Sequence, residues 1–521
     1  MNLTPQKTLF FFLIIIFLNL LAYGPSFFDP PRSDQIVYLG NTSGQKDLYS
    51  LAIKNYAYNR SHQMYGLPGD DALFRPVIFF LLGIQRWAFG YHFLYWQLSS
   101  FFLHLIVLWF LLKTLLKIHP GRGAFFLVAL FSLIPSNNDM VTWHHINSYL
   151  VAIACLLVAL NKIWLARNDK LIPWPTVLTI TFLMTVASLI YEVCALYALL
   201  LAGYLVFRHS RGNLSPRIRS IGQGLVITLS AASRIIFSQL DIISRGSKQL
   251  MAASGPLSYE FLVNGLNQIV PVSFWWLYSG AFPTQLKIFP YQRTMVLPYY
   301  AFAEGSPISY DLWALLSVGV SSGLIIIYFH FIKKAFSIDG IKRAALPAVM
   351  LMLFIITISV GRISHGEARF KLAESAYNGY LFWLFALISA YALFPFKTLR
   401  PTERPSFLKR AVWLLLTAAI TLNFLVTFEV NKRRSHQMGF QKRLLAETRK
   451  LVNQHGAQEG FSFNVSDAVK DHVYADWITN NDDPSHQGYV YLQLLYPDYY
   501  TDKDPEFTYS ADQVFQRNIA P

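Results

Sequence analysis

Long apolar stretches recur along the chain from one end to the other, separated by shorter polar segments. A helix of about 20 apolar residues crosses the hydrocarbon core of a bilayer, and in lipid the backbone must satisfy its own hydrogen bonds. The pattern therefore predicts an all-α polytopic membrane protein. We expect eleven transmembrane helices, near residues 8–24, 92–112, 123–136, 147–166, 174–190, 193–207, 220–240, 310–332, 344–360, 377–396 and 411–428.

Two apolar stretches can be interpreted in more than one way. Residues 76–90 could form a further span, but the basic residues after 92–112 would then lie outside, against the usual charge bias. We therefore expect 76–90 to form a helix that lies in the outer interface. As one helix, residues 174–207 would be about 50 Å long, which exceeds the bilayer core. They predict two short spans that turn near Tyr191 and Glu192.

With these assignments, every short loop on one side of the membrane is basic, which marks that side as cytoplasmic. The N-terminus is then cytoplasmic and the C-terminus extracytoplasmic. We interpret the first span as a retained anchor rather than a cleaved signal peptide, because Lys7 is the only basic residue before it and no small-residue cleavage site follows. The basic residues of the inner loops are Lys113, Lys117, Arg122, Lys162, Arg167, Lys170, Arg208, Arg211, Arg217, Arg219, Lys333, Lys334, Lys342, Arg343, Lys397, Arg400, Arg404, Lys409 and Arg410.

Composition agrees with this interpretation. Hydrophobic residues make up 54% of the 521 residues and charged residues only 14%, against about a quarter in soluble domains. The net charge of +15 comes largely from the inner loops, so we expect no nucleic acid partner. Cys155 and Cys194 both lie in predicted spans, which argues against a disulfide or a metal site there. The absence of a disulfide-bearing outer domain favours a bacterial inner membrane.

The predicted topology divides the chain into a transmembrane domain, 1–429, and a small extracytoplasmic tail, 430–521. The third outer loop holds Trp275 and Trp276, which could cover a sugar or pack in the core. We find no duplicated halves of the kind that many transporters have. The outer loops lie at 25–91, 137–147, 241–309 and 361–376.

Acidic residues in the first outer loop could carry chemistry. Asp34 follows the first span by about ten residues and could act as a general base near the membrane surface, or simply start a turn. Asp29 precedes two prolines and is typical of a turn. Asp70 and Asp71, with Arg75, could bind a metal or substrate, although acids at this position also cap the interfacial helix that follows.

Further polar residues fall on the same predicted side. His144 and His145 begin an outer helix and could bind phosphate or carry protons, or could be ordinary interfacial residues. Glu192 lies where two spans turn, and Arg234 lies in the outer half of another span. Charged residues at such depth are candidates for function, and the alternative is a structural ion pair between these two.

The fourth outer loop is basic, against the usual charge bias. Arg362, His365, Arg369 and Lys371 suit an anionic ligand such as a lipid phosphate, or lipid headgroups in general.

The order of these features resembles the GT-C membrane glycosyltransferases, which include protein mannosyltransferases, aminoarabinose transferases of lipid A and tetratricopeptide-bearing mannosyltransferases. The resemblance covers about residues 1–207, and the tetratricopeptide repeats are absent. Gln35 stands where the family often has a second acid, which disfavours a metal at that position. The segments that carry the resemblance are Asp34–Tyr38, Phe74–Pro76 with Gly90–His92 and His104, Phe125–Tyr149 with Pro135 and Trp143, and Leu189–Glu192.

This resemblance implies an inverting transfer of a sugar from a polyprenyl-phosphate or polyprenyl-diphosphate donor to a lipid, glycan or protein acceptor. Asp34 would deprotonate the acceptor hydroxyl. Arg362, Arg369 and Lys371, with Arg293 as a weaker candidate, would stabilise the leaving phosphate. The resemblance implies no certain cofactor, and a divalent metal such as Mg²⁺ or Mn²⁺ stays open.

Two other functions fit a protein with many spans. An O-antigen-type polymerase or ligase also has basic outer loops but does not need an aspartate just after the first span. A non-enzymatic transporter of lipid or glycan would show internal duplication and spans broken by Gly or Pro at matching positions.

Overall fold

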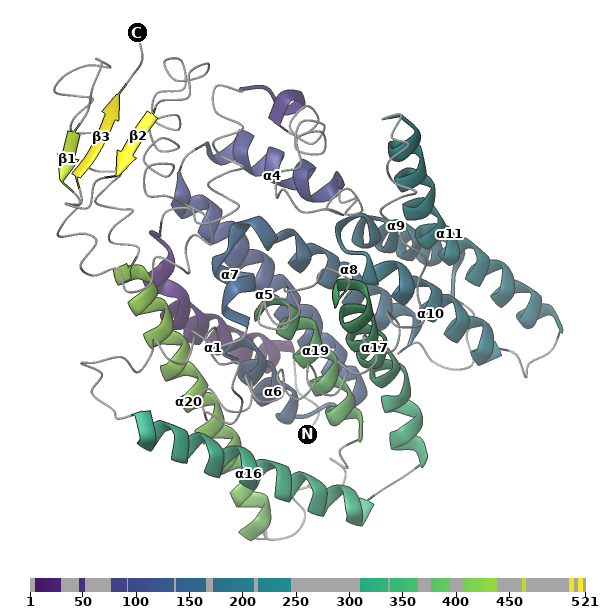
Figure 1. Ribbon diagram of the computed structural model, residues 1–521. Coiled ribbons are helices and arrows are strands. Elements are labelled where there is room, and N and C mark those ends of the chain that lie inside the picture. The colour runs from purple at the N-terminus through teal and green to yellow at the C-terminus, as the bar shows by residue number, and fades with distance from the viewer. Residues whose placement is uncertain are drawn as a thin grey trace.

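The structure is a computed structural model in which most of the apolar segments of the chain are described (Figure 1). All statements below concern the described residues. These are 5–29, 46–51, 76–90, 92–134, 137–164, 172–209, 214–244, 310–335, 338–363, 376–393, 407–437, 462–464, 506–509 and 514–518.

Each of the eleven apolar segments predicted from the sequence coincides with a helix. Five of these helices contain a stretch that is long and apolar enough to cross a membrane, and the others have shorter apolar stretches, so the count of eleven crossings stays a prediction. The helices are α1 (Pro5–Tyr23), α5 (Phe93–Ile118), α6 (Gly123–Ser132), α8 (Ser148–Ile163), α9 (Trp174–Ile190), α10 (Val193–His209), α11 (Leu214–Ser244), α16 (Tyr310–Ala335), α17 (Ile338–Ile363), α19 (Ala376–Leu393) and α20 (Phe407–Gln437).

Both ambiguous stretches are helical, and the chain breaks between the two short spans where the sequence predicts, whereas the interfacial position of 76–90 stays a prediction. Helix α9 ends at Ile190 and α10 begins at Val193, so the chain breaks at Tyr191 and Glu192 rather than continuing as one long helix. Residues 76–90 form a separate helix, α4 (Pro76–Phe89), which packs on α5, α8 and α9 and lies near the top of the view in Figure 1.

Hydrogen bonds between helices show which helix ends lie together. The Tyr23 hydroxyl at the end of α1 donates to the Ser132 carbonyl at the end of α6, over 2.9 Å. The Asn431 amide in the last part of α20 donates to the Ala22 carbonyl over 3.0 Å. These ends belong to the predicted outer side, and we call this side of the helix bundle the outer end.

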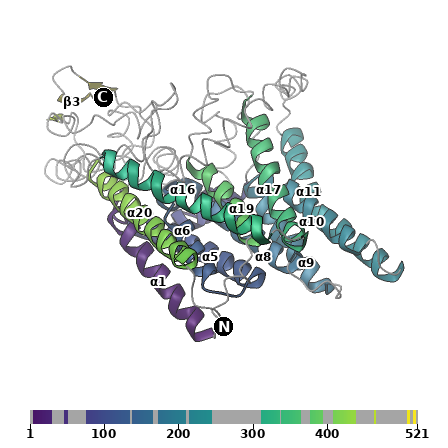
Figure 2. The same ribbon diagram turned by 90° about the horizontal axis from the view of Figure 1, so that it is seen from below.

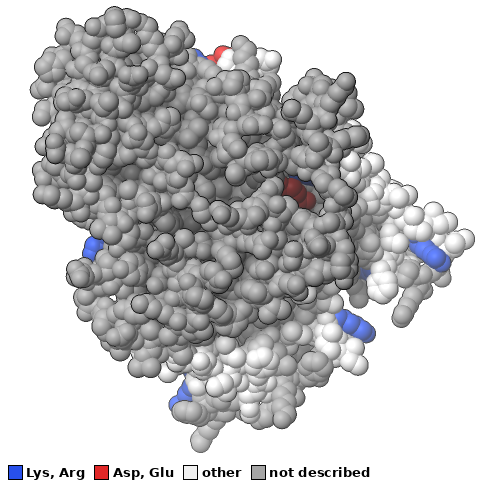
Figure 3. Space-filling model, viewed as in Figure 1, with Lys and Arg blue, Asp and Glu red and all other residues white. Residues whose placement is uncertain are grey.

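The opposite end gathers the helix ends that the sequence places in the cytoplasm. Lys117 of α5 donates to the Asn161 carbonyl of α8 over 3.3 Å, and Arg208 of α10 donates to the Ile163 carbonyl over 2.9 Å. In Figure 3, blue side chains on the right of the view lie near the end of α11 that follows α10. The helix ends thus gather at two ends of the bundle, while the assignment of each end to a side of the membrane stays a prediction.

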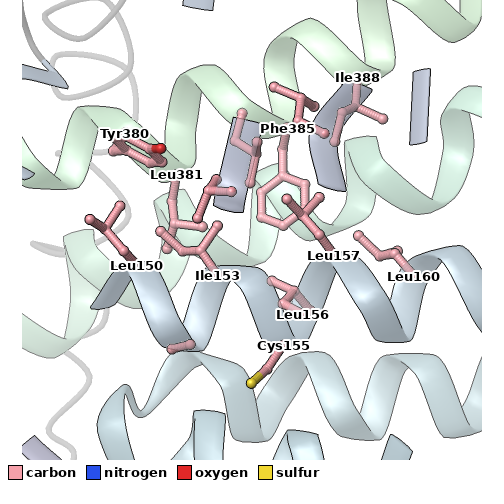
Figure 4. Packing of buried hydrophobic residues seen from close by; sticks show 14 of the residues in the cluster. Leu150, Ile153, Cys155, Leu156, Leu157, Leu160, Tyr380, Leu381, Phe385 and Ile388 are labelled. Atoms are coloured by element: carbon pink, nitrogen blue, oxygen red, sulfur yellow. The ribbon is translucent and has the colours of Figure 1, made fainter. Parts of the chain in front are cut away.

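The core is formed by large apolar side chains from helices far apart in the sequence. In Figure 4, Leu150, Ile153 and Leu157 of α8 face Leu381 and Phe385 of α19. All five are buried. Van der Waals contacts between closely packed side chains favour this arrangement over contact of the same side chains with lipid chains.

Small residues allow some helices to approach closely. A Cβ atom on Gly224 of α11 would lie 2.7 Å from Val206 Cγ2 of α10, and one on Gly323 of α16 would lie 3.1 Å from Leu415 Cδ1 of α20. Small residues at such contacts are typical of membrane helices. Figure 2 shows α1, α20 and α16 side by side, as their contacts also indicate.

The tail differs from the all-α prediction. It contains three short strands, β1 (Ser462–Asn464), β2 (Glu506–Tyr509) and β3 (Val514–Asn518), in an antiparallel sheet of order β1-β3-β2 (Figure 1). Phe463 and Tyr509 both pair with Phe515 across the sheet. Aromatic and β-branched residues favour strands, but runs of three to five residues give too short a pattern to predict them.

Candidate functional site

Only some of the predicted site residues have described side chains. These are His144 and Glu192, together with Arg234. His145 lies in a short helix and Arg362 lies near the end of α17, but the side chains of these two residues are not described. The other predicted residues lie outside the described residues: Asp34, Asp70, Asp71, Arg75, His365, Arg369, Lys371, Arg293, Trp275 and Trp276.

His144 is buried in the bundle, with only 1% of its surface exposed. It begins a 3₁₀ turn (His144–Ile146) between α7 (Asn138–Thr142) and α8. Its Nδ1 atom lies 3.3 Å from the Ser100 hydroxyl of α5, and its ring centroid lies 6.4 Å from that of Trp96. Burial and a hydrogen bond therefore fix the His144 ring inside the protein, and its role with phosphate or protons stays a prediction.

Asn147 connects the second outer loop both to Ser100 of α5 and to α4. The Asn147 amide donates to the Ser100 hydroxyl over 3.1 Å and to Gln85 Oε1 of α4 over 3.4 Å. The Gln85 amide in turn donates to the Ser99 hydroxyl over 3.1 Å. Residues from α4, α5 and the start of α8 thus form one polar network at the outer end.

A second polar contact fixes the turn between α9 and α10. Arg234 Nη2 lies 3.9 Å from Glu192 Oε1, and Arg234 Nη1 donates to the Ser188 carbonyl over 2.6 Å. The Arg234 side chain is 12% exposed and that of Glu192 is 29% exposed. The ion pair that the sequence suggested between these two residues is present. It neutralises two charges that would be costly to hold separately at this depth.

An aromatic contact joins these two polar groups. The rings of Tyr149 and Tyr191 lie 4.8 Å apart between centroids, and both side chains are buried. Tyr149 follows His144 by five residues and Tyr191 directly precedes Glu192. The contact therefore places the second outer loop beside the turn that holds the Glu192–Arg234 pair.

The first outer loop leaves the bundle at the same end. Phe27, just beyond α1, packs against Phe101 with ring centroids 5.3 Å apart, and Phe101 is the neighbour of Ser100. Asp29 is 4% exposed, and its backbone N–H donates to the Ser26 carbonyl over 3.0 Å. This bond confirms the prediction of a turn at Asp29.

Several residues of the network were not predicted from the sequence. Ser100 and Gln97 lie on one face of α5, and the Gln97 amide donates to the Thr142 carbonyl over 3.3 Å. His104, which belongs to the segments that carry the family resemblance, is one turn further along the same face and lies 2.9 Å from the Tyr380 hydroxyl of α19. Polar residues spaced three to four apart in an apolar helix are the signal that could have identified this face.

The described residues include no group of three or more His, Cys, Asp or Glu side chains that could hold a metal ion. Asp70 and Asp71 are not among the residues searched, so a site for Mg²⁺ or Mn²⁺ at these acids stays a prediction.

Comparison with known protein families and with curated proteins found no match. Among solved structures, the chain is similar to crystal structures of the oligosaccharyltransferase of Archaeoglobus fulgidus. The apo form has 13% sequence identity and a TM-score of 0.45, covering 96% of this chain and 61% of that chain. The form tethered with an acceptor peptide containing the NVT sequon has 14% identity and a TM-score of 0.42, with the same coverage. The complex with Zn and sulfate has 12% identity and a TM-score of 0.39, and the match covers 86% of this chain and 56% of that chain. The chain thus spans about three fifths of the length of that protein.

Proposed function

We propose that this protein is an inverting membrane glycosyltransferase of the GT-C type. It moves a sugar from a polyprenyl-phosphate or polyprenyl-diphosphate donor to an acceptor on the extracytoplasmic side of a bacterial inner membrane. The observation that carries the proposal is the contact between Tyr149 and Tyr191, which brings His144 and the Glu192–Arg234 pair together at the outer end.

The position of the first outer loop supports Asp34 as the base. Asp29 is buried at the outer end, where Phe27 packs beside the polar network around Ser100. Asp34 follows Asp29 by five residues, and five residues span at most about 18 Å. A carboxylate tied this closely to the end of α1 can be held where an acceptor hydroxyl meets the donor.

The chemical step exchanges one C–O bond for another. The acceptor oxygen attacks the anomeric carbon while Asp34 takes the hydroxyl proton. The bond from the anomeric carbon to the phosphate oxygen breaks, and the phosphate leaves with the electron pair, so the anomeric configuration inverts. Arg362, Arg369 and Lys371 stabilise the charge that develops on the leaving phosphate.

The acceptor in this proposal is defined by its hydroxyl group. It reaches the site from the extracytoplasmic side and supplies a hydroxyl, which a lipid, a glycan or a protein can do. Asp70 and Asp71 are the residues that would hold a divalent metal if one takes part.

The test is sugar transfer in membranes from a panel of radiolabelled polyprenyl-phosphate sugars. Asp34→Asn keeps the size of the side chain and removes the base, so transfer should fall about a hundredfold or more. Asp47→Asn is the matched control, because it makes the same change in the same loop. Asp47 Oδ1 accepts a hydrogen bond from the Ser50 N–H over 2.8 Å, which an amide oxygen can also accept.

Loss of transfer in Asp34→Asn with normal transfer in Asp47→Asn supports both the reaction class and the base. Equal transfer by both variants keeps the reaction class and moves the base to Asp70 or Asp71. No transfer by the wild type from any donor counts against the glycosyltransferase and favours the polymerase, ligase or transporter alternatives.

A further inference from the structure

The second outer loop contains buried polar atoms that no described residue satisfies. They are Asn137 Oδ1, both amide atoms of Asn138, Asn147 Oδ1 and Ser148 Oγ. These four residues are at most 1% exposed. Buried polar atoms in proteins almost always have a partner, so a group of them close together in the chain calls for one.

Helix capping does not explain this group. Asn147 is the N-cap residue of α8, where a side-chain oxygen normally accepts from a backbone N–H in the first turn. Here Asn147 makes no capping hydrogen bond. Its amide instead donates to Ser100 and Gln85, which holds Asn147 Oδ1 in place without using it.

Other unsatisfied amides in the described chain have a clear structural use. Asn161, Gln223 and Asn431 each leave the amide oxygen without a partner while the NH₂ group binds a distant part of the chain: Thr114 of α5, the Ile172 carbonyl just before α9 and the Ala22 carbonyl of α1. Asn138 and Ser148 differ, because neither uses any side-chain atom in a described hydrogen bond. Their polar atoms therefore do nothing to hold the described helices together.

The chemistry of the group indicates the class of ligand. Amides and a hydroxyl offer both donors and acceptors without charge, and their described partners Gln85 and Ser100 are also uncharged. A phosphate would call for cations. Sugar hydroxyls donate and accept at once, and a site built from amides and hydroxyls pairs with several of them together.

From this geometry we infer that Asn138, Asn147 and Ser148 form a subsite for the uncharged ring of the transferred sugar, a hexose or pentose. The inference rests on the proposed glycosyltransferase function and adds a specificity-determining site to it. His144 bonds to Ser100, which also holds Asn147, so the subsite adjoins the residue that the sequence had already singled out.

Ser148→Ala is the sharpest variant, because it removes a hydroxyl that no described group needs. Its folding should be unchanged or slightly more stable, since an unsatisfied buried hydroxyl is lost. The KM for a polyprenyl-phosphate sugar should rise roughly three- to tenfold, the loss of one hydrogen bond. Inhibition by sugar-free polyprenyl phosphate should not change.

Ser389→Ala is the matched control. Ser389 is a buried serine of α19 whose hydroxyl also lacks a partner, but it lies near Tyr391, which bonds to the His119 carbonyl at the opposite end of the bundle. The KM of this variant should equal that of the wild type. Asn138→Ala should behave like Ser148→Ala, with a larger rise because two polar atoms are removed.

A second readout does not depend on transfer. A panel of free hexoses and pentoses is added to the purified proteins, and the midpoint of thermal unfolding is measured. Stabilisation of the wild type and of Ser389→Ala, but not of Ser148→Ala, supports the subsite even if no donor is used, in which case the proposed function alone fails. Equal sugar responses in the wild type and Ser148→Ala, or no response in the wild type, overturn the subsite.

Discussion

Arg234 Nη2 and Glu192 Oε1 lie 3.9 Å apart at the outer end of the bundle, with one residue on α11 and the other in the turn between α9 and α10. The guanidinium is also held by the Ser188 carbonyl. One arginine of α11 thus holds both the end of α9 and the turn before α10, so the turn at Glu192 is fixed by charge as well as by packing.

Removal of both charges should destabilise the protein by less than the sum of the two single removals. Arg234 is only 12% exposed, and Glu192→Gln removes the negative charge beside it. We expect this variant to lower the free energy of unfolding by about 1–2 kcal/mol, which is less than the cost of breaking a fully buried ion pair. Arg234→Met should cost a similar amount, and the double variant less than the sum. Thermal unfolding of the purified variants measures this coupling.

Glu429→Gln is a control for that series, because the Glu429–Lys432 contact of 4.0 Å involves a lysine that is 63% exposed. Its unfolding midpoint should not shift. A double variant at Glu192 and Arg234 that equals the sum of the single effects would show that the pair has no coupling.

The buried contact between His104 and Tyr380 should also show coupling. Tyr380→Phe leaves the buried His104 Nδ1 without its described partner, which we expect to cost about 1–2 kcal/mol. His104→Phe combined with Tyr380→Phe removes both polar groups and should be closer to the wild type. The unfolding midpoints of Tyr380→Phe, His104→Phe and the double variant test this. A double variant less stable than either single variant would contradict the coupling.

Two glycines should respond in opposite directions to alanine. A Cβ atom on Gly224 would meet Val206 Cγ2 at 2.7 Å and the Ala202 carbonyl oxygen at 3.4 Å, so Gly224→Ala should force α10 and α11 apart and lower the unfolding midpoint. Gly203→Ala meets nothing within 4 Å and should raise stability by roughly 0.5–1 kcal/mol. Adding Val206→Ala to Gly224→Ala should restore part of the loss. If both glycine variants shift in the same direction, the close contact does not control stability.

The hydrogen bond from Asn147 to Gln85 should control the mobility of α4. Gln85→Leu removes the bonds to Asn147 and Ser99 that hold this helix on the bundle. Backbone amides of residues 76–89 should then exchange with deuterium faster, while those of α8 change little. Ser99→Ala removes only one of the two bonds and should have a smaller effect. Unchanged exchange in Gln85→Leu would show that apolar packing alone holds α4.

The helices were predictable because lipid leaves few alternatives. An apolar stretch in a bilayer must be a helix, and the length limit required a break within 174–207, which falls at Tyr191 and Glu192 as predicted. The strands of the tail could not be predicted, since runs such as Glu506–Tyr509 are too short to show an alternating pattern.

The candidate site was predictable only in part. His144 and Glu192 stand out because charged or titratable residues are rare in apolar segments. The roles of Ser100 and Gln85 depend on contacts with residues 44 to 62 positions away, which no local pattern reports. Uncharged amides and hydroxyls carry no signal of function until packing shows which of them have partners.

The bond from Asn431 to the Ala22 carbonyl has a consequence for biogenesis. It joins the last helix of the bundle to the first across 409 positions, and Tyr23 in turn binds α6. A ribosome adds roughly 5–20 residues each second, so α1 waits about 20–80 s in the membrane before α20 is made. During that interval the face of α1 that later packs against α20 is exposed to lipid or to an insertion chaperone. A truncation that removes α20 should therefore leave a protein that inserts but is recognised by quality-control proteases as unfinished.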